Sequence, residues 1–148
     1  MTTIAYNHDE KMVAVDSRTC CNNVIVNDKA NKIYQVGDLT FIACGDVPDI
    51  QEFMETYPNI NKKLNCHGVM IDGGGFAYDF GVNDSGEFSK CKITYNDAFG
   101  SGCEFAIAAM DFGKTAKEAV EYAMTRDNKT GGKVQTIYLE SNAIKSPN

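Results

Sequence analysis

Met1-Thr2-Thr3-Ile4-Ala5 opens the chain and contains the first candidate functional residue, Thr2. Methionine before a small residue such as threonine is normally trimmed, so we expect Met1 to be removed. Removal places a free α-amine and a hydroxyl on Thr2. An α-amine has a pKa near ~7.7–8.0, so it can act as a base at neutral pH and activate a threonine hydroxyl. The stretch therefore predicts an N-terminal nucleophile, and an ordinary first strand residue is the alternative.

The composition indicates one globular domain spanning residues 1–148. The net charge is −6 and the sequence pI is about 4.8, without a stripe of Lys and Arg, which argues against nucleic-acid binding. No apolar run approaches the ~18 residues of a membrane span, and the N-terminus lacks the pattern of a secretory signal. We therefore expect a cytoplasmic protein with no nucleic-acid or membrane partner.

The six cysteines are interpreted as reduced thiols, most of them small core residues. Cys66 and His67 are adjacent but have no partners at zinc-ligand spacing, so no metal site is predicted.

Apolar runs between turn residues predict strands and helices in separate blocks. The predicted strands cover residues 2–7, 12–16, 24–26, 32–36, 39–44, 68–72, 76–82, 88–94 and 134–139. One helix begins near Pro48 and is stopped by Pro58, a second contains Phe105 and Met110, and a third runs from Thr115 to about residue 125. This order predicts an α+β fold of two sheets with helices on the outer faces, and a disordered tail from about residue 141.

Further motifs follow the first threonine in order. Val13-Ala14-Val15-Asp16-Ser17-Arg18 precedes Lys32-Ile33, and Gly100-Ser101-Gly102 precedes the loop 126–132, which reads Arg-Asp-Asn-Lys-Thr-Gly-Gly. With Met1-Thr2-Thr3, these pieces resemble the proteasome β-type subunit family, which includes the peptidase of the bacterial heat-shock ATP-dependent protease. The resemblance implies a four-layer αββα N-terminal nucleophile hydrolase sandwich. It also implies a threonine peptidase that needs no cofactor and forms a homo-oligomeric ring or double ring around its peptide or unfolded protein substrate.

The resemblance implies catalytic roles for residues from three parts of the chain. Thr2 would be the nucleophile, Lys32 would favour its deprotonated form, and Asp16 would pair with Lys32. The other implied residues, Ser101, Asp127 and Thr130, would position the N-terminal amine as the base, with Thr130 in place of the family's serine. The alternatives are a surface lysine at 32, a turn residue at 16, a helix N-cap at 101 and an exposed loop acid at 127.

The resemblance also implies an oxyanion donor and a substrate site. The backbone N–H of Gly45 would stabilise the tetrahedral oxyanion, and a simple turn glycine is the alternative. Small or apolar residues would surround the pocket for the side chain before the scissile bond, namely Thr19, Ala30, Ala43 and Val47. Cys20 would lie along the strand edge to which an extended peptide adds.

The sequence departs from the family between the first helix and the strand at Gly68. Relatives carry a second long helix there, whereas only residues 59–66 remain here, which predicts a reduced helical layer on one side. That layer faces away from the partner ring in relatives, so an ATPase unfoldase as partner is in doubt, as is the usual ring size. Activation would need only the removal of Met1.

Two other functions remain open. A small-molecule amidase of the same nucleophile class would share the chemistry, and a single pocket on a monomer would favour it. A catalytically inactive structural ring subunit would retain Met1.

Overall fold

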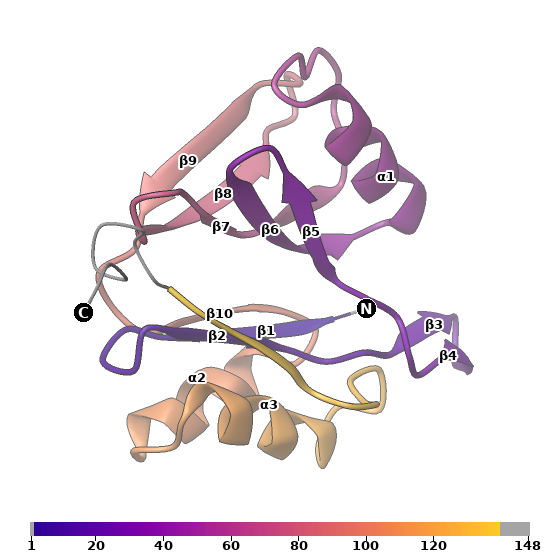
Figure 1. The fold of residues 1–148 in the computed structure, drawn as a ribbon. Coiled ribbons are helices and arrows are strands. Elements are labelled where there is room, and N and C mark those ends of the chain that lie inside the picture. The colour runs from indigo at the N-terminus through magenta and orange to yellow at the C-terminus, as the bar shows by residue number, and fades with distance from the viewer. Residues whose placement is uncertain (1, 140–148) are drawn as a thin grey trace. The chain divides into compact units, whose positions relative to one another are not determined.

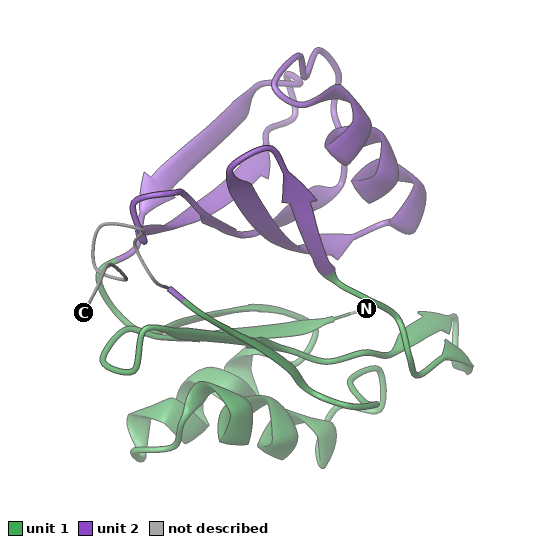
Figure 2. Cartoon of the chain, in the orientation of Figure 1, with its two compact units in different colours: residues 1–32, 94–138 green, residues 33–93, 139–148 purple. Residues whose placement is uncertain are grey.

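The computed structural model describes residues 2–139 in two compact units (Figure 2). Residues 2–32 and 94–138 form unit 1, and residues 33–93 with Leu139 form unit 2. Met1 and the tail predicted to be disordered lie outside the described residues. The single domain over residues 1–148 stays a prediction.

Unit 1 is built on a four-stranded antiparallel sheet in the order β10-β1-β2-β11. Strands β1 (Thr3–Asn7) and β2 (Met12–Val15) form the central hairpin, and β10 (Asp97–Gly100) and β11 (Gln135–Tyr138) flank it. Every residue of β1 and β2 is buried. β2 is entirely apolar, whereas β1 begins and ends with the polar residues Thr3 and Asn7. A separate two-stranded ribbon follows, formed by β3 (Thr19–Cys21) and β4 (Val24–Asn27).

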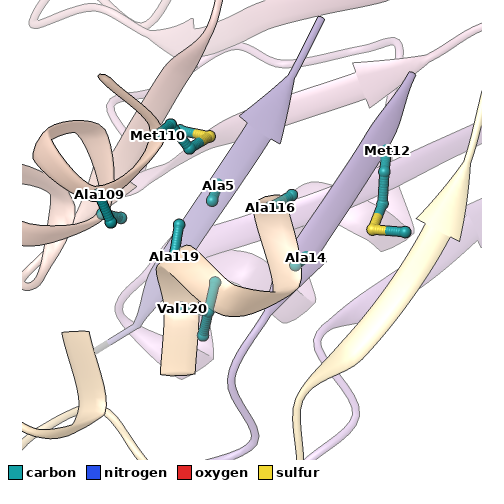
Figure 3. Packing of buried hydrophobic residues seen from close by; sticks show 9 residues of the cluster. Ala5, Met12, Ala14, Ala109, Met110, Ala116, Ala119 and Val120 are labelled. Carbon is teal, nitrogen blue, oxygen red and sulfur yellow. The ribbon is translucent and has the colours of Figure 1, made fainter. Parts of the chain in front are cut away.

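Two helices pack on the sheet of unit 1, as Figure 1 shows: α2 (Cys103–Asp111) and α3 (Ala116–Met124). Thr115 and Glu118 form the capping box at the start of α3 that the sequence predicts. The interface consists mostly of small side chains, including Ala5, Ala14 and Ala119, with Met12 and Met110 filling gaps (Figure 3). Small residues let the helices approach β1 closely, and this packing fixes the strand that follows Thr2.

Unit 2 contains a five-stranded antiparallel sheet, β5-β6-β7-β8-β9, and one helix. Its elements are β5 (Ile33–Val36), β6 (Leu39–Gly45), α1 (Val47–Thr56), β7 (Cys66–Ile71), β8 (Ala77–Val82) and β9 (Phe88–Lys92). Its core is aromatic, since Phe41 meets Phe53 and Phe80 edge to face at 5.3 and 5.0 Å between ring centroids.

The predicted α+β class is confirmed, with three helices and eleven strands in residues 2–139. Residues 59–65 form no helix, as predicted. The strands β3 and β10 were not predicted, because Thr19–Cys21 is very short and Asp97–Gly100 lacks an apolar alternation. No helix in this part of the chain is long and apolar enough to cross a membrane.

Candidate active site

Lys32 forms the centre of a buried polar cluster in unit 1. Its Nζ lies 3.0 Å from Thr2 Oγ1, 2.9 Å from Asp16 Oδ1 and 2.6 Å from the Arg18 carbonyl oxygen. The Lys32 side chain is 7% exposed and that of Asp16 is 0% exposed. These three acceptors match the three N–H donors of an ammonium group. The alternative interpretation of Lys32 as a surface lysine is therefore wrong.

The Asp16 carboxylate is stabilised by hydrogen bonds on both oxygens. Oδ1 accepts from Lys32 Nζ and from the Thr3 backbone N–H at 3.1 Å. Oδ2 accepts from the backbone N–H groups of Arg18 at 3.3 Å and Gly131 at 3.0 Å. A buried charge is costly unless it is paired and hydrogen-bonded, and Asp16 meets both conditions. Asp16 therefore holds the Lys32 ammonium beside Thr2.

The peptide bond between Thr2 and Thr3 is fixed at both ends. The Thr2 carbonyl oxygen accepts from the Ser101 backbone N–H at 2.8 Å, while the Thr3 N–H donates to Asp16. Gly100 makes this approach possible, because its φ is +95° and a Cβ there would overlap the Thr2 carbonyl. Thr2 itself is buried, with 6% of its surface exposed. Its hydroxyl thus has a defined position.

A second polar group surrounds Asp127. Its Oδ2 accepts from Ser101 Oγ and from Thr130 Oγ1, each at 2.6 Å, and its Oδ1 accepts from the Lys129 N–H at 3.1 Å. Partial burial acts to raise the pKa of Asp127, but the hydrogen bonds from Ser101, Thr130 and Lys129 outweigh it, so this pKa lies below its usual value. Gly102, rather than Ser101, is the N-cap of α2, so the N-cap alternative for Ser101 is wrong.

The lowered pKa of Asp127 predicts part of the acid sensitivity of the fold. A depressed carboxyl pKa contributes stability above the unfolded value, ~3.9, and this contribution is lost as pH falls through the folded value. We expect Asp127→Asn to be less stable than the wild type at pH 7 and to lose less stability on acidification below about pH 4. Urea unfolding at several pH values measures this. The exposed Asp111→Asn is the control, and an acid loss in Asp127→Asn as steep as in the wild type would contradict the assignment.

Arg18 holds the loop that carries Asp127 and Thr130. Its Nε and Nη2 donate to the two Asp28 carboxylate oxygens at 2.8 and 3.2 Å, and its Nη1 donates to the Asn128 carbonyl at 2.9 Å. The hydrogen bond to Asp28 raises the pKa of Arg18, and the same bond lowers the pKa of Asp28. Arg18 belongs to the motif found in the sequence, but no contact of its side chain was predicted.

Two other groups near the cluster were missed. Gln135 Nε2 donates to Ser17 Oγ at 2.9 Å and to the Ala30 carbonyl at 2.7 Å, which ties β11 to the segment before Lys32. The hydroxyl of Thr3 contacts the hydroxyl of Thr130, which lies 127 residues further along the chain. A glutamine in a short strand carries no sequence signal for such a role, whereas the position of Thr3 next to Thr2 is a signal that the sequence does contain.

The predicted substrate-site residues are divided between the units. Thr19 and Cys20 lie in β3, and Ala30 borders a hollow of about 290 Å³ in unit 1 that is also lined by Lys29 and Lys133. Three others belong to unit 2, namely Ala43, Gly45 and Val47. Gly45 has φ +135°, and a Cβ there would overlap the Asn65 carbonyl, so this position requires glycine. The substrate roles of these residues, and the oxyanion role of Gly45, stay predictions.

Cys66 and His67, the adjacent residues for which no metal site is predicted, lie in unit 2. His67 Nε2 lies 3.1 Å from Cys44 Sγ, burial lowers the pKa of His67, and burial raises the pKa of Cys66 to about 12. Within residues 2–139, no group of three or more His, Cys, Asp or Glu side chains is placed to hold a metal ion.

The chain matches known proteins in structure but not in sequence. No protein-family model matches the chain, and no curated protein is similar to it in sequence. Solved structures do match, among them eukaryotic HslV from Trypanosoma brucei, with a TM-score of 0.67 over 92% of this chain and 99% of that chain. The chain has the HslV fold. This likeness of fold agrees with the resemblance to the proteasome β-type family.

The identity to HslV is 16%, which establishes the fold and not the roles of individual residues. Evidence for those roles comes from the contacts within unit 1. All six residues predicted as catalytic lie in this unit, and the two groups around Lys32 and Asp127 share the Thr2–Thr3 segment.

Proposed function

We propose that this chain is a threonine-type endopeptidase subunit whose nucleophile is Thr2, exposed by removal of Met1. The observation that carries the proposal is the buried Lys32 ammonium, 3.0 Å from Thr2 Oγ1 and paired with Asp16. A structural subunit gains little from this arrangement, since a buried ion pair is weak evidence for stability. A nucleophile gains much from it, because a neighbouring positive charge favours the deprotonated hydroxyl.

The contacts of Lys32 assign it an electrostatic role. With its N–H groups directed at three acceptors, the ammonium donates to Thr2 Oγ1 and cannot accept the hydroxyl proton. The base is then the α-amine of Thr2. This amine takes the proton as Oγ1 attacks the peptide carbonyl and returns it to the leaving amine, which leaves an ester on Thr2. Water, deprotonated by the same amine, then releases the acid product and restores Thr2.

The Asp127 group orients this base in the proposal. Ser101 supplies both a backbone N–H to the Thr2 carbonyl and a hydroxyl to the Asp127 carboxylate. Ser101 thereby links Thr2 to Asp127 through its backbone N–H and its hydroxyl. The ionised Asp127 also favours a protonated amine when the amine has accepted the hydroxyl proton, which helps the attack.

The finer architecture is part of the same proposal. The four-layer αββα sandwich, the Gly45 oxyanion donor, an apolar specificity pocket and peptide addition along Cys20 follow the family resemblance. We also propose a single peptidase domain that assembles into a homo-oligomeric ring or double ring in the cytoplasm. The missing second helix leaves an ATPase unfoldase as a doubtful partner.

The test is intact mass spectrometry after incubation with a peptide epoxyketone, a reagent that needs a free α-amine and the adjacent hydroxyl on one residue. We expect the mass of the chain without Met1 plus one inhibitor. A chain that lacks Met1 and forms no adduct would contradict the peptidase proposal. A chain made in its native host that keeps Met1 completely would favour the structural ring subunit instead.

The oligomeric state and the size of the substrate that is cleaved distinguish the endopeptidase from a small-molecule amidase. Size-exclusion chromatography with light scattering is expected to give a closed oligomer that cleaves unfolded protein. A monomer that forms the adduct but cleaves only small amides would favour the amidase and contradict the endopeptidase.

A further inference from the structure

The side chain of Thr3 joins the Lys32 and Asp127 groups. Its Oγ1 lies 2.6 Å from Thr130 Oγ1 and accepts from the Gly102 backbone N–H at 3.0 Å. Its backbone N–H donates to Asp16, and its carbonyl accepts from the Asp16 N–H at 3.3 Å. Thr3 is 0% exposed and Thr130 is 1% exposed, so water does not replace these contacts.

The direction of the hydroxyl hydrogen bonds follows from the charge of Asp127. A carboxylate can only accept hydrogen bonds, so the Thr130 hydroxyl donates its single proton to Asp127 Oδ2. The proton between the two threonines must then come from Thr3. The result is one directed chain, from the Gly102 N–H to Thr3, from Thr3 to Thr130 and from Thr130 to Asp127.

We propose that Thr3 is a positioning residue for the peptidase reaction, whose hydroxyl holds Thr130 and Asp127 in register with the Thr2 backbone. This inference rests on the proposed function for its kinetic consequence, whereas the hydrogen-bond chain is tested without it. This series of hydrogen bonds polarises the hydroxyls of Thr3 and Thr130 toward Asp127, because successive hydrogen bonds strengthen one another in a low-dielectric interior. Thr3 acts through Asp127 and does not touch the substrate.

The role also accounts for the threonine at position 130. The Thr130 hydroxyl has to accept from Thr3 and donate to Asp127 at the same time, which requires one rotamer. A β-branched side chain is stiff at χ1, so the added methyl restricts the hydroxyl to few orientations. The substitution of the family's serine is therefore compatible with a fixed relay.

The decisive variant is Thr3→Val, which keeps the shape and removes the hydroxyl. We expect the pKa of Asp127, followed by carbon NMR, to rise toward the usual range, because its donor Thr130 loses the neighbour that orients it. We expect kcat for a fluorogenic peptide to fall roughly 10- to 100-fold with KM unchanged. Positioned acid–base groups accelerate reactions by ~10²–10⁴-fold, and the variant should lose a part of this acceleration. Thr3→Ser retains the hydroxyl and should restore both values to near wild type.

Thr40→Val is the matched control for loss of a buried threonine hydroxyl. Thr40 lies in unit 2, is 8% exposed and donates to Gln35 Oε1 at 2.9 Å. It should lower the melting temperature while leaving the Asp127 pKa and kcat unchanged. If Thr3→Val fails to fold, Thr3→Cys serves, because its thiol is a weaker donor of similar size and should give intermediate values.

Each outcome decides the inference. An unchanged pKa of Asp127 in Thr3→Val, or the same defect in Thr3→Ser as in Thr3→Val, would overturn it. Wild-type values in Thr3→Cys would also overturn it if Thr3→Val does not fold. A wild-type chain that forms no epoxyketone adduct would contradict the peptidase proposal alone, and the NMR titration would still decide whether Thr3 positions Asp127.

Discussion

Replacing Thr2 with alanine is expected to reduce peptide hydrolysis to background, by roughly 10³-fold or more, because it removes the proposed nucleophile itself. The epoxyketone adduct should disappear in the same variant, although Met1 is still removed before alanine. Steady-state hydrolysis of a fluorogenic peptide and intact mass after inhibitor treatment measure the two effects on one sample.

The Thr2→Ala variant should still fold and assemble. Without the Thr2 hydroxyl, Lys32 Nζ keeps Asp16 Oδ1 and the Arg18 carbonyl as acceptors, so the ammonium does not become an unpaired buried charge. Thr2→Ser is the control, since it retains a hydroxyl on the same residue and should keep measurable hydrolysis. Hydrolysis at the wild-type rate in Thr2→Ala would end the proposed mechanism.

Lys32→Met is expected to affect both stability and activity. It removes the ammonium but keeps the length of the side chain, and it leaves the fully buried Asp16 carboxylate with only backbone donors. Breaking a buried ion pair by removing one partner costs about 3–5 kcal/mol. We expect the free energy of unfolding in urea to fall by about this amount and hydrolysis to reach background even where the variant remains folded.

Lys62→Met is the matched control for Lys32→Met. Lys62 pairs with Glu52 at 3.0 Å, but the two side chains are 59% and 40% exposed, and surface pairs contribute only ~0–1 kcal/mol. The control should change neither hydrolysis nor stability by more than about 1 kcal/mol. A Lys32→Met chain as stable and as active as this control would show that the Lys32 cluster has neither role.

The parts of the fold that the sequence predicts correctly depend on local signals. The run Met12–Val15 after a polar turn defined the central hairpin, and Thr115 with Glu118 defined the start of α3. The spacing of Asp16 and Lys32, taken from the family resemblance, selected two residues whose side chains lie 2.9 Å apart. The local strand and turn patterns contain no such long-range contact.

The rest depends on contacts between distant segments. β10 consists of Asp97–Gly100 and forms because β1 offers it a partner edge, a tertiary effect absent from its own residues. The hydrogen bonds of Arg18 with Asp28 and Asn128 depend on where the loop after α3 returns, so neither could be derived from spacing. The roles of Gly45, Ala43 and Val47 require the substrate and stay predictions.

The separation between Thr3 and Thr130, 127 residues along the chain, has a consequence for biosynthesis. During translation Thr2, the residue proposed as nucleophile, leaves the ribosome well before Ser101, Thr130 and Gly131. Ser101 holds the Thr2 backbone, while Thr130 and Gly131 hydrogen-bond to Asp127 and Asp16. At ~5–20 residues per second, the delay is roughly 6–25 s. A nascent chain therefore lacks the assembled clusters around Lys32 and Asp127 until residues 101–131 have been made and have folded against the first strand. Under the proposed function, this order of emergence keeps a growing peptidase inert toward neighbouring nascent chains.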